Sequence, residues 1–128
     1  MPLKLLLFVA VGGAAGAVAR FTVMSGIGHW LGHGFPWGTL AVNVIGSIVL
    51  GAVIEVSALV WSPSPEVRAM VVVGLLGAFT TFSTFSMDVY FLINRGMVLP
   101  AAGYVAASVV ICVFGFWGGI VAMRQLLA

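Results

Sequence analysis

The sequence predicts an all-α membrane protein of four transmembrane helices, and two observations carry this prediction. The chain of 128 residues is 62% hydrophobic and only 6% charged, with a mean hydropathy of +1.25, whereas soluble domains average about 25% charged residues. Four apolar stretches are each long enough for a membrane span of about 20 residues. These stretches run over residues 3–24, 40–60, 70–93 and 99–123. We therefore expect a single transmembrane domain over residues 1–128 and no soluble domain.

The first stretch, residues 3–24, contains Gly12, Gly13 and Gly16, which are typical of a close helix-packing face. Lys4 followed by an apolar run also resembles a signal peptide, although the remaining chain would still be a membrane protein. Arg20 lies near the far end of the span. An arginine there either snorkels to the interface or marks the foot of an aqueous vestibule, where it raises the local concentration of anions.

Three polar residues, Thr39, Asn43 and Ser47, lie at intervals of four at the start of the second stretch, with Thr39 just before it. This spacing places them on one helix face. An asparagine in lipid needs a partner, so Asn43 either holds two helices together or offers its N–H donors to a polar path. Glu55 lies late in the span, near enough to its end for solvent contact, and we assign it no role.

The third stretch contains five hydroxyl residues between positions 80 and 86, interleaved with Phe82 and Phe85 and preceded by Gly74 and Gly77. On a continuous helix, Phe79, Phe82 and Phe85 would share a face. One or two hydroxyls in lipid satisfy themselves by bonding to the carbonyl one turn back. Five of them beside two glycines predict a polar path, because irregular backbone at membrane depth is tolerated only there or inside protein.

The fourth stretch carries Tyr104, Ser108 and Cys112 at intervals of four, on an otherwise aliphatic helix. A single tyrosine near the end of a span is typical of an interfacial anchor. Three polar or polarisable groups in register favour one wall of a narrow polar track. Cys112 is the only cysteine, so an intramolecular disulfide is excluded.

Basic residues are almost evenly divided between the two sides of the membrane. With four spans, Lys4, Arg68 and Arg124 lie on one side, and Arg20 and Arg95 lie on the other. An excess of lysine and arginine normally sets the orientation of a membrane protein. The near balance favours an antiparallel dimer as much as a single orientation held by other factors.

The functional class follows from what the spans contain and lack. Their polar groups are hydroxyls and amides, which donate hydrogen bonds, and carboxylates are almost absent. An anion path supplies donors or basic groups, and a phenylalanine edge carries the positive part of the ring quadrupole. We therefore expect a channel for a small anion. The sequence contains no catalytic or nucleotide-binding motif, so we expect no enzyme. A scattered net charge of +2 does not indicate nucleic acid.

Two motifs carry a specific resemblance. The pattern Gly38-Thr39-Leu40-x-Val42-Asn43, followed by Gly74-x-x-Gly77-x-x-Thr80-Thr81-Phe82-Ser83-Thr84-Phe85-Ser86, resembles the Fluc/CrcB family of bacterial fluoride channels. Length and four-span layout agree over the whole chain. The resemblance implies an antiparallel, dual-topology homodimer in the bacterial inner membrane. Such a dimer exports cytoplasmic fluoride passively through two pores and so lowers its toxicity.

The resemblance also implies roles for individual residues. The residues implied to form the fluoride path are Asn43, Phe82, Phe85, Tyr104 and Ser108, with Thr39, Thr81 and Cys112 on the same faces. Arg20 matches an arginine near the vestibule. The third helix is expected to break between Gly77 and Thr80, whose carbonyls in both protomers would hold a structural Na⁺ that is not transported.

The sequence departs from the family pattern at three positions. Ala78 stands where glycine is frequent, Cys112 where a hydroxyl is expected, and Asp88 where glutamate is frequent. The competing class is a small multidrug-type transporter, which is also a dual-topology dimer of four-helix chains. Its proton coupling needs a carboxylate in the first helix, and residues 3–24 contain none. A non-conducting assembly subunit would leave the hydroxyl cluster unexplained.

Overall fold

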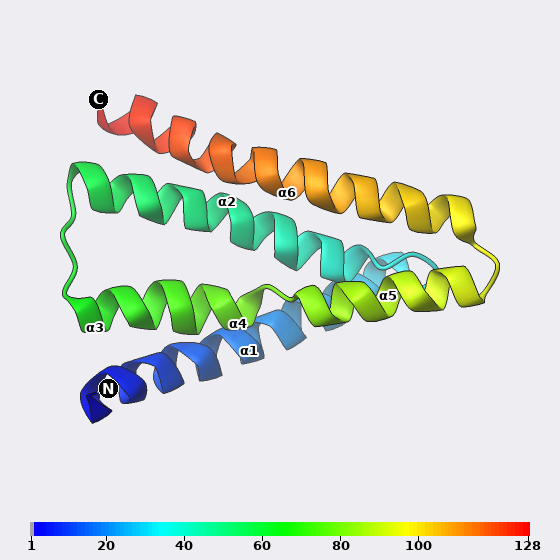
Figure 1. Ribbon diagram of the computed structural model, residues 1–128, viewed down its shortest axis with the longest axis horizontal. Helices are drawn as coiled ribbons and strands as arrows, with labels where there is room; N and C mark the ends of the chain where they lie inside the picture. Colours follow the sequence, from blue (N-terminus) through cyan, green and yellow to red (C-terminus); the bar gives the residue numbers. More distant parts are fainter. Residues whose placement is uncertain (1) are drawn as a thin grey trace.

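The chain forms four long helical rods, as the composition predicts. The computed structural model describes residues 2–128, and Figure 1 shows helix α1 (Leu3–Leu31), helix α2 (Trp37–Leu59), a composite third rod (Pro65–Asn94) and helix α6 (Val98–Leu127). Each rod is long and apolar enough to cross a membrane. Both termini and the connection after α2 lie at one end of the molecule, and the other two connections lie at the opposite end (Figure 1). The all-α, four-span, multi-pass prediction is confirmed.

The helices extend beyond the apolar stretches from which they were predicted. Helix α1 continues past residue 24 to Leu31 and ends where Gly32 adopts a φ of 78°, a left-handed conformation that glycine adopts easily. A hydropathy pattern marks the part of a helix that suits lipid. The helix itself continues until a residue such as this glycine ends it.

The third rod is built from four segments. Helix α3 (Pro65–Arg68) begins at Ser64, whose hydroxyl accepts a hydrogen bond from the Val67 amide at 3.2 Å, the usual form of an N-cap. It leads into η1 (Ala69–Leu76), a π-helix, then into α4 (Gly77–Phe79) and α5 (Phe82–Asn94). A π-helix has wider turns than an α-helix, and such turns are often found at functional sites.

The rod is interrupted at Thr80 and Thr81. Their backbones are extended, with φ and ψ of −90° and 158° at Thr80 and of −152° and 120° at Thr81. The break therefore falls at the C-terminal edge of the interval expected for it, because Gly77 and the two residues after it still form a helical turn. Since the interruption separates Phe79 from α5, the three phenylalanines do not share one continuous helix face.

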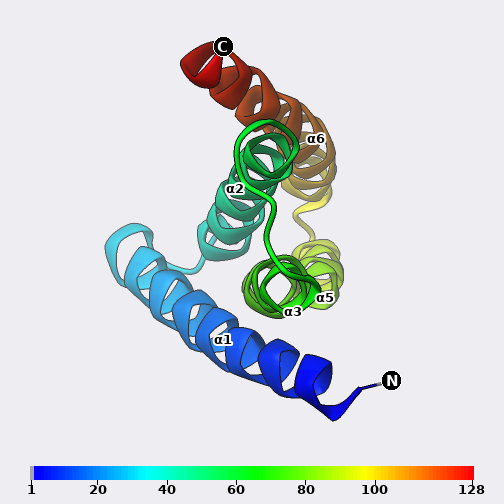
Figure 2. The same cartoon turned by 90° about the vertical axis from the view of Figure 1, so that its left-hand side faces the viewer.

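Helix α1 lies next to the third rod (Figure 2). It packs against η1 and α4 through small residues. The Met70 carbonyl lies over Gly12 and the Leu75 carbonyl lies over Gly16, and Gly74 faces the backbone of α1 in return. A Cβ at any of the three glycines would overlap these backbone atoms. Lipid offers no hydrophobic force between helices, so close contact of small residues supplies the attraction. The predicted packing face of the first span is confirmed.

Helices α2 and α6 form the second close pair. Gly51 of α2 lies against the Phe116 carbonyl, and Gly119 of α6 lies against the Ile48 carbonyl. At the end of this pair, Arg124 forms a salt bridge of 2.8 Å with Glu55, which is only 7% exposed. The expectation that Glu55 contacts solvent is wrong, because α6 extends far enough to cover it and to pair with it.

Candidate functional site

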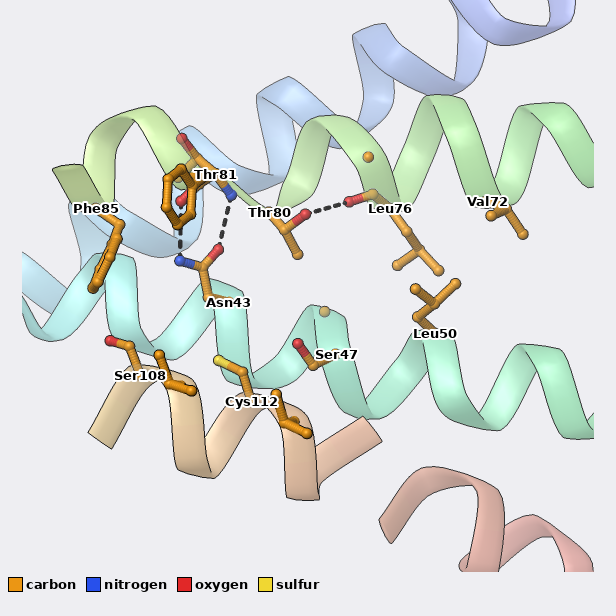
Figure 3. A pocket seen from close by; sticks show the side chains of 15 residues that line it. Asn43, Ser47, Leu50, Val72, Leu76, Thr80, Thr81, Phe85, Ser108 and Cys112 are labelled. Atoms are coloured by element: carbon orange, nitrogen blue, oxygen red, sulfur yellow. Dashed lines mark hydrogen bonds between the residues drawn. The ribbon is translucent and has the colours of Figure 1, made fainter. Parts of the chain in front are cut away.

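A groove opens between α2, α6 and the third rod at the level of the break. Its volume is about 380 Å³. Figure 3 shows its polar side chains converging from three elements. The polar lining residues are Asn43, Ser47, Thr80, Thr81, Ser108 and Cys112. The apolar lining includes Phe82, Phe85, Val109 and Val113. Within residues 2–128, no charged side chain lines this groove.

Asn43 holds the backbone of the break. Its Nδ2 donates to the Thr81 carbonyl at 3.0 Å, and its Oδ1 accepts from the Thr81 amide at 2.8 Å (Figure 3). Both groups would otherwise be unpaired at membrane depth, where each costs several kcal/mol. The sequence left open whether Asn43 holds two helices together or lines a polar path. In the structure it does hold α2 to the third rod, and it also lines the groove.

Most hydroxyls of the 80–86 cluster are used to build the break. Thr81 is the N-cap of α5, and its Oγ1 accepts from the Thr84 amide at 3.2 Å and donates to Thr84 Oγ1 at 3.1 Å. Thr80 and Ser86 donate to the carbonyls of Leu76 and Phe82, each at 3.0 Å. Such local bonds satisfy the hydroxyls without a ligand.

The two phenylalanines differ in their surroundings. Phe82 is 77% exposed, whereas Phe85 is partly buried between Phe82 and Tyr104, with ring-centroid distances of 5.4 Å and 5.1 Å. Both line the groove. Phe85 is therefore held by its neighbours, while Phe82 has a free face.

The three residues predicted to form a polar face on α6 do not all line the groove. Ser108 and Cys112 line the groove, and Ser47 of α2 lies opposite them (Figure 3). Ser108 is 8% exposed, and its Oγ is buried with no hydrogen-bond partner within residues 2–128. Tyr104 is fully buried one turn nearer the loops, and its hydroxyl donates to Asp88 at 3.0 Å.

A second cavity, of about 580 Å³, lies at the loop end of the molecule. We call it the vestibule. Arg20 and the buried Thr39 line it, as do Asp88, Arg95 and His33. Asp88 also accepts the hydrogen bond from Tyr104, so one residue of the vestibule lining is tied to α6.

Asp88, Arg95 and His33 were not singled out as site residues from the sequence. One signal could have identified Asp88. Asp88 and Tyr104 are equally far from Gly96 along the chain, and Gly96 makes the tight turn between α5 and α6 with a φ of 79°. A helical hairpin around that turn brings the two side chains together. Arg95 and His33 lie in or beside loops, whose paths the sequence does not define.

The break also releases backbone carbonyls. In a continuous helix the Thr81 amide would bond to the Gly77 carbonyl, but here it donates to Asn43. The Thr84 amide donates to Thr81 Oγ1 instead of the Thr80 carbonyl. The carbonyl oxygens of Gly77 and Thr80 are thus free from helical bonding, and uncharged oxygen ligands of this kind suit a hard monovalent cation.

Comparisons with known proteins agree with the motif resemblance. The family described as CrcB-like protein, Camphor Resistance (CrcB), matches residues 7–120. A relative from Rhodospirillum centenum, named fluoride-specific ion channel FluC, is 49% identical over 98% of this chain and 100% of its own length. Relatives of the same name from Nitrobacter winogradskyi and Geobacter sulfurreducens are 47% and 46% identical, over 94% of this chain and 96% and 98% of their own lengths. The chain belongs to the CrcB family.

Proposed function

We propose that this protein is a fluoride-selective ion channel that lets cytoplasmic fluoride leave a bacterial cell passively. The observation that carries the proposal is the buried Ser108 hydroxyl, which has no partner within residues 2–128 and faces an uncharged groove. A buried hydroxyl left unpaired costs about 1–3 kcal/mol. A small anion beside it would supply the missing acceptor, and the relatives named as fluoride-specific channels indicate which anion.

The path runs from the vestibule into the groove. Arg20 and Arg95 raise the local concentration of anions at the vestibule. Thr39 and Asp88 line the vestibule, and Tyr104 donates to Asp88 from α6. Asn43 and Ser108, which line the groove, follow Thr39 and Tyr104 one turn further along α2 and α6. Thr81 and Cys112 complete the polar lining, and the ring edges of Phe82 and Phe85 face the anion.

The direction of flow needs no energy source beyond the membrane potential. A bacterial inner membrane is negative inside, so an anion gains about 2.3 kcal/mol per 100 mV by leaving the cell. A passive conductance in that membrane therefore lowers cytoplasmic fluoride and its toxicity.

The functional unit is an antiparallel homodimer with two pores. Phe82 is 77% exposed beside an open groove, and a second copy of the chain is the partner that closes the groove. A symmetric dimer presents the same surface twice, which gives two equivalent pores. The near balance of basic residues permits both orientations in the bilayer.

A structural Na⁺ at the dimer axis completes the proposal. The carbonyls of Gly77 and Thr80 from both protomers would hold it, since their helical partners donate elsewhere. The cation neutralises the partial negative charge of oxygens that meet at mid-membrane. It is not transported.

A small multidrug-type transporter is the competing class. Its proton coupling requires a free carboxylate in the first helix, and α1 contains no aspartate or glutamate. The carboxylates of α2 and α5 are engaged, since Glu55 pairs with Arg124 and Asp88 accepts from Tyr104. The carboxylate inventory thus favours the channel.

The test is efflux from liposomes that contain the purified protein, measured for fluoride and chloride side by side with an ionophore to balance charge. We expect fast fluoride efflux, chloride efflux near that of empty liposomes, and no dependence on a proton gradient. Equal efflux of the two anions, or flux only with a proton gradient, would contradict the proposal.

A further inference from the structure

Arg20 makes a contact that a purely electrostatic role does not require. Its Nε donates to the Ala78 carbonyl at 2.9 Å, which joins α1 to a residue 58 positions away. In a continuous helix that carbonyl would accept from the Phe82 amide. Because the rod is interrupted at Thr80 and Thr81, Arg20 supplies the donor that the helix cannot.

The contact is one half of a two-sided support. On the α1 side, Gly16 lies one turn before Arg20 and lets the Leu75 carbonyl and Ala78 approach closely. On the α2 side, Asn43 binds the Thr81 backbone, and Gly46 lies against the Thr80 methyl group, where a Cβ would overlap it. Each helix thus contributes one polar side chain and one glycine to the break.

We propose that Arg20 is a positioning residue of the fluoride path, which fixes the end of α4 through its Nε–H. The proposal deepens the proposed function and rests on it. With Ala78 held from α1 and Thr81 held from α2, the extended residues Thr80 and Thr81 have little freedom. The first turn of α5, which carries Phe82 and Phe85, therefore starts at a fixed place relative to the groove.

Two substitutions of Arg20 distinguish a role of its charge from a role of its hydrogen bond to Ala78, because the two roles predict opposite effects on fluoride efflux. In Arg20→Gln, the glutamine Nε2 stands at the same point along the side chain as the arginine Nε, so the donor to Ala78 is kept while the charge is lost. In Arg20→Lys, the charge is kept, but the donor moves one atom further out. Arg20→Met removes both.

The experiment compares fluoride efflux from liposomes for these three variants at saturating fluoride and high ionic strength, where interactions of exposed charges are screened. Arg95→Gln is the matched control, because Arg95 lines the same vestibule and reports the effect of lost charge alone. We expect Arg20→Gln to conduct like Arg95→Gln. We expect Arg20→Met and Arg20→Lys to lose about tenfold or more, the factor that a charge-assisted hydrogen bond is worth.

Amide hydrogen exchange over residues 79–86 gives a readout that does not depend on conduction. Exchange should accelerate by about tenfold or more in Arg20→Met and stay near the original rate in Arg20→Gln, since only the former frees the break to open locally. Loss of efflux in Arg20→Gln beyond that of Arg95→Gln, or unchanged exchange in Arg20→Met, would overturn the positioning role. If the unmodified protein conducts no fluoride, the proposed function fails, and the exchange data still decide the role of Arg20.

Discussion

The hydroxyl of Ser108 is unusual because it is buried and lacks a hydrogen-bond partner within residues 2–128. Ser108 is 8% exposed and lies one turn from the well-satisfied Tyr104. Buried polar groups are almost always paired. The proposed fluoride path accounts for this departure, since an anion in the groove would accept the hydrogen bond of Ser108, and a substitution at Ser108 can separate effects on stability from effects on conduction.

Replacing Ser108 by alanine should therefore lower fluoride efflux without lowering stability. The substitution removes an unsatisfied buried group, so we expect the free energy of unfolding to stay the same or to rise by about 1 kcal/mol. Efflux from liposomes and thermal unfolding in detergent measure the two effects. The matched control is Ser86→Ala, which removes an exposed hydroxyl already bonded to the Phe82 carbonyl and should leave efflux unchanged. A fall in both efflux and stability for Ser108→Ala would mean that the hydroxyl is structural.

The phenylalanines provide a second prediction at the residue scale. Phe82→Ile and Phe85→Ile keep an apolar side chain but remove the positive ring edge, so both should strongly reduce fluoride efflux. Phe85→Ile should also lower stability, by about 1–3 kcal/mol, because it loses two aromatic contacts worth about 0.5–1.5 kcal/mol each, whereas Phe82→Ile loses only one of them and should lower stability about half as much. Size-exclusion chromatography checks that each variant keeps the oligomeric state of the unmodified protein. Unchanged efflux in both variants would make these rings packing residues only.

Among the elements, the interrupted third rod decides what the molecule can do. A continuous helix would present the carbonyls of Gly77 and Thr80 to its own next turn. The break instead frees them, because Asn43 and the Thr81 hydroxyl take the amides that would have bonded to them. The same two contacts fix the start of α5, because Asn43 ties Thr81 to α2 and the Thr81 hydroxyl caps the first turn of α5.

Asn43 is the natural place to test this arrangement. Asn43→Leu leaves the Thr81 amide and carbonyl unpaired at membrane depth, where each costs several kcal/mol. We expect loss of fluoride efflux together with faster amide exchange at residues 80–84. Asn43→Gln carries the same amide one methylene further from the backbone and should recover neither property fully. A variant with leucine at this position that still conducts would contradict the role of Asn43 at the break.

Gly74 and Gly77 show how much of the break in the third rod can be predicted from the sequence. Gly74 and Gly77 correctly indicated irregular backbone nearby, but both lie in helical segments and the extended residues are Thr80 and Thr81. The position of the break depends on Asn43, which is 38 residues away, and on Arg20, which is further still. Local pattern could not supply these contacts. For the same reason the pattern could not tell which hydroxyls of the cluster would be used by the backbone.

The polar residues at intervals of four on α2 and α6 were easier to predict, because helical periodicity defines a face within one helix. Asn43, Ser47, Ser108 and Cys112 do meet in one groove. Thr39 and Tyr104 lie outside it, since the vestibule and the turn at Gly96 organise that end of the molecule. Helical periodicity shows which residues share one face of a helix. Only the tertiary contacts show which part of that face meets another helix.

At the scale of the whole molecule, the surface is apolar and the groove at the break is open. Large apolar side chains are exposed on every rod, as expected for contact with lipid or a second copy, while the groove at the break stays open on one side. The proposed antiparallel dimer closes the groove and brings the free carbonyls of two breaks together.

Removal of sodium should test that assembly. Replacing Na⁺ by a large organic cation at constant ionic strength should weaken the dimer and reduce fluoride efflux, because the carbonyls of Gly77 and Thr80 would meet without a charge between them. Native mass spectrometry or cross-linking measures the dimer, and restoring Na⁺ should restore both properties. Dimer and efflux that are indifferent to the replacement would contradict a structural Na⁺ site.

Both chain termini lie at the same end of the molecule (Figure 1), and this has a consequence for gene fusion. If two copies are joined by a short flexible linker, their first helices must enter the bilayer from the same side, so the copies are parallel. An antiparallel pair encoded by one gene needs a linker that itself crosses the membrane once. A duplicated gene could thus keep the proposed double pore only by acquiring an additional span. Its two halves could then diverge in sequence, so that each half lines its own side of the proposed channel.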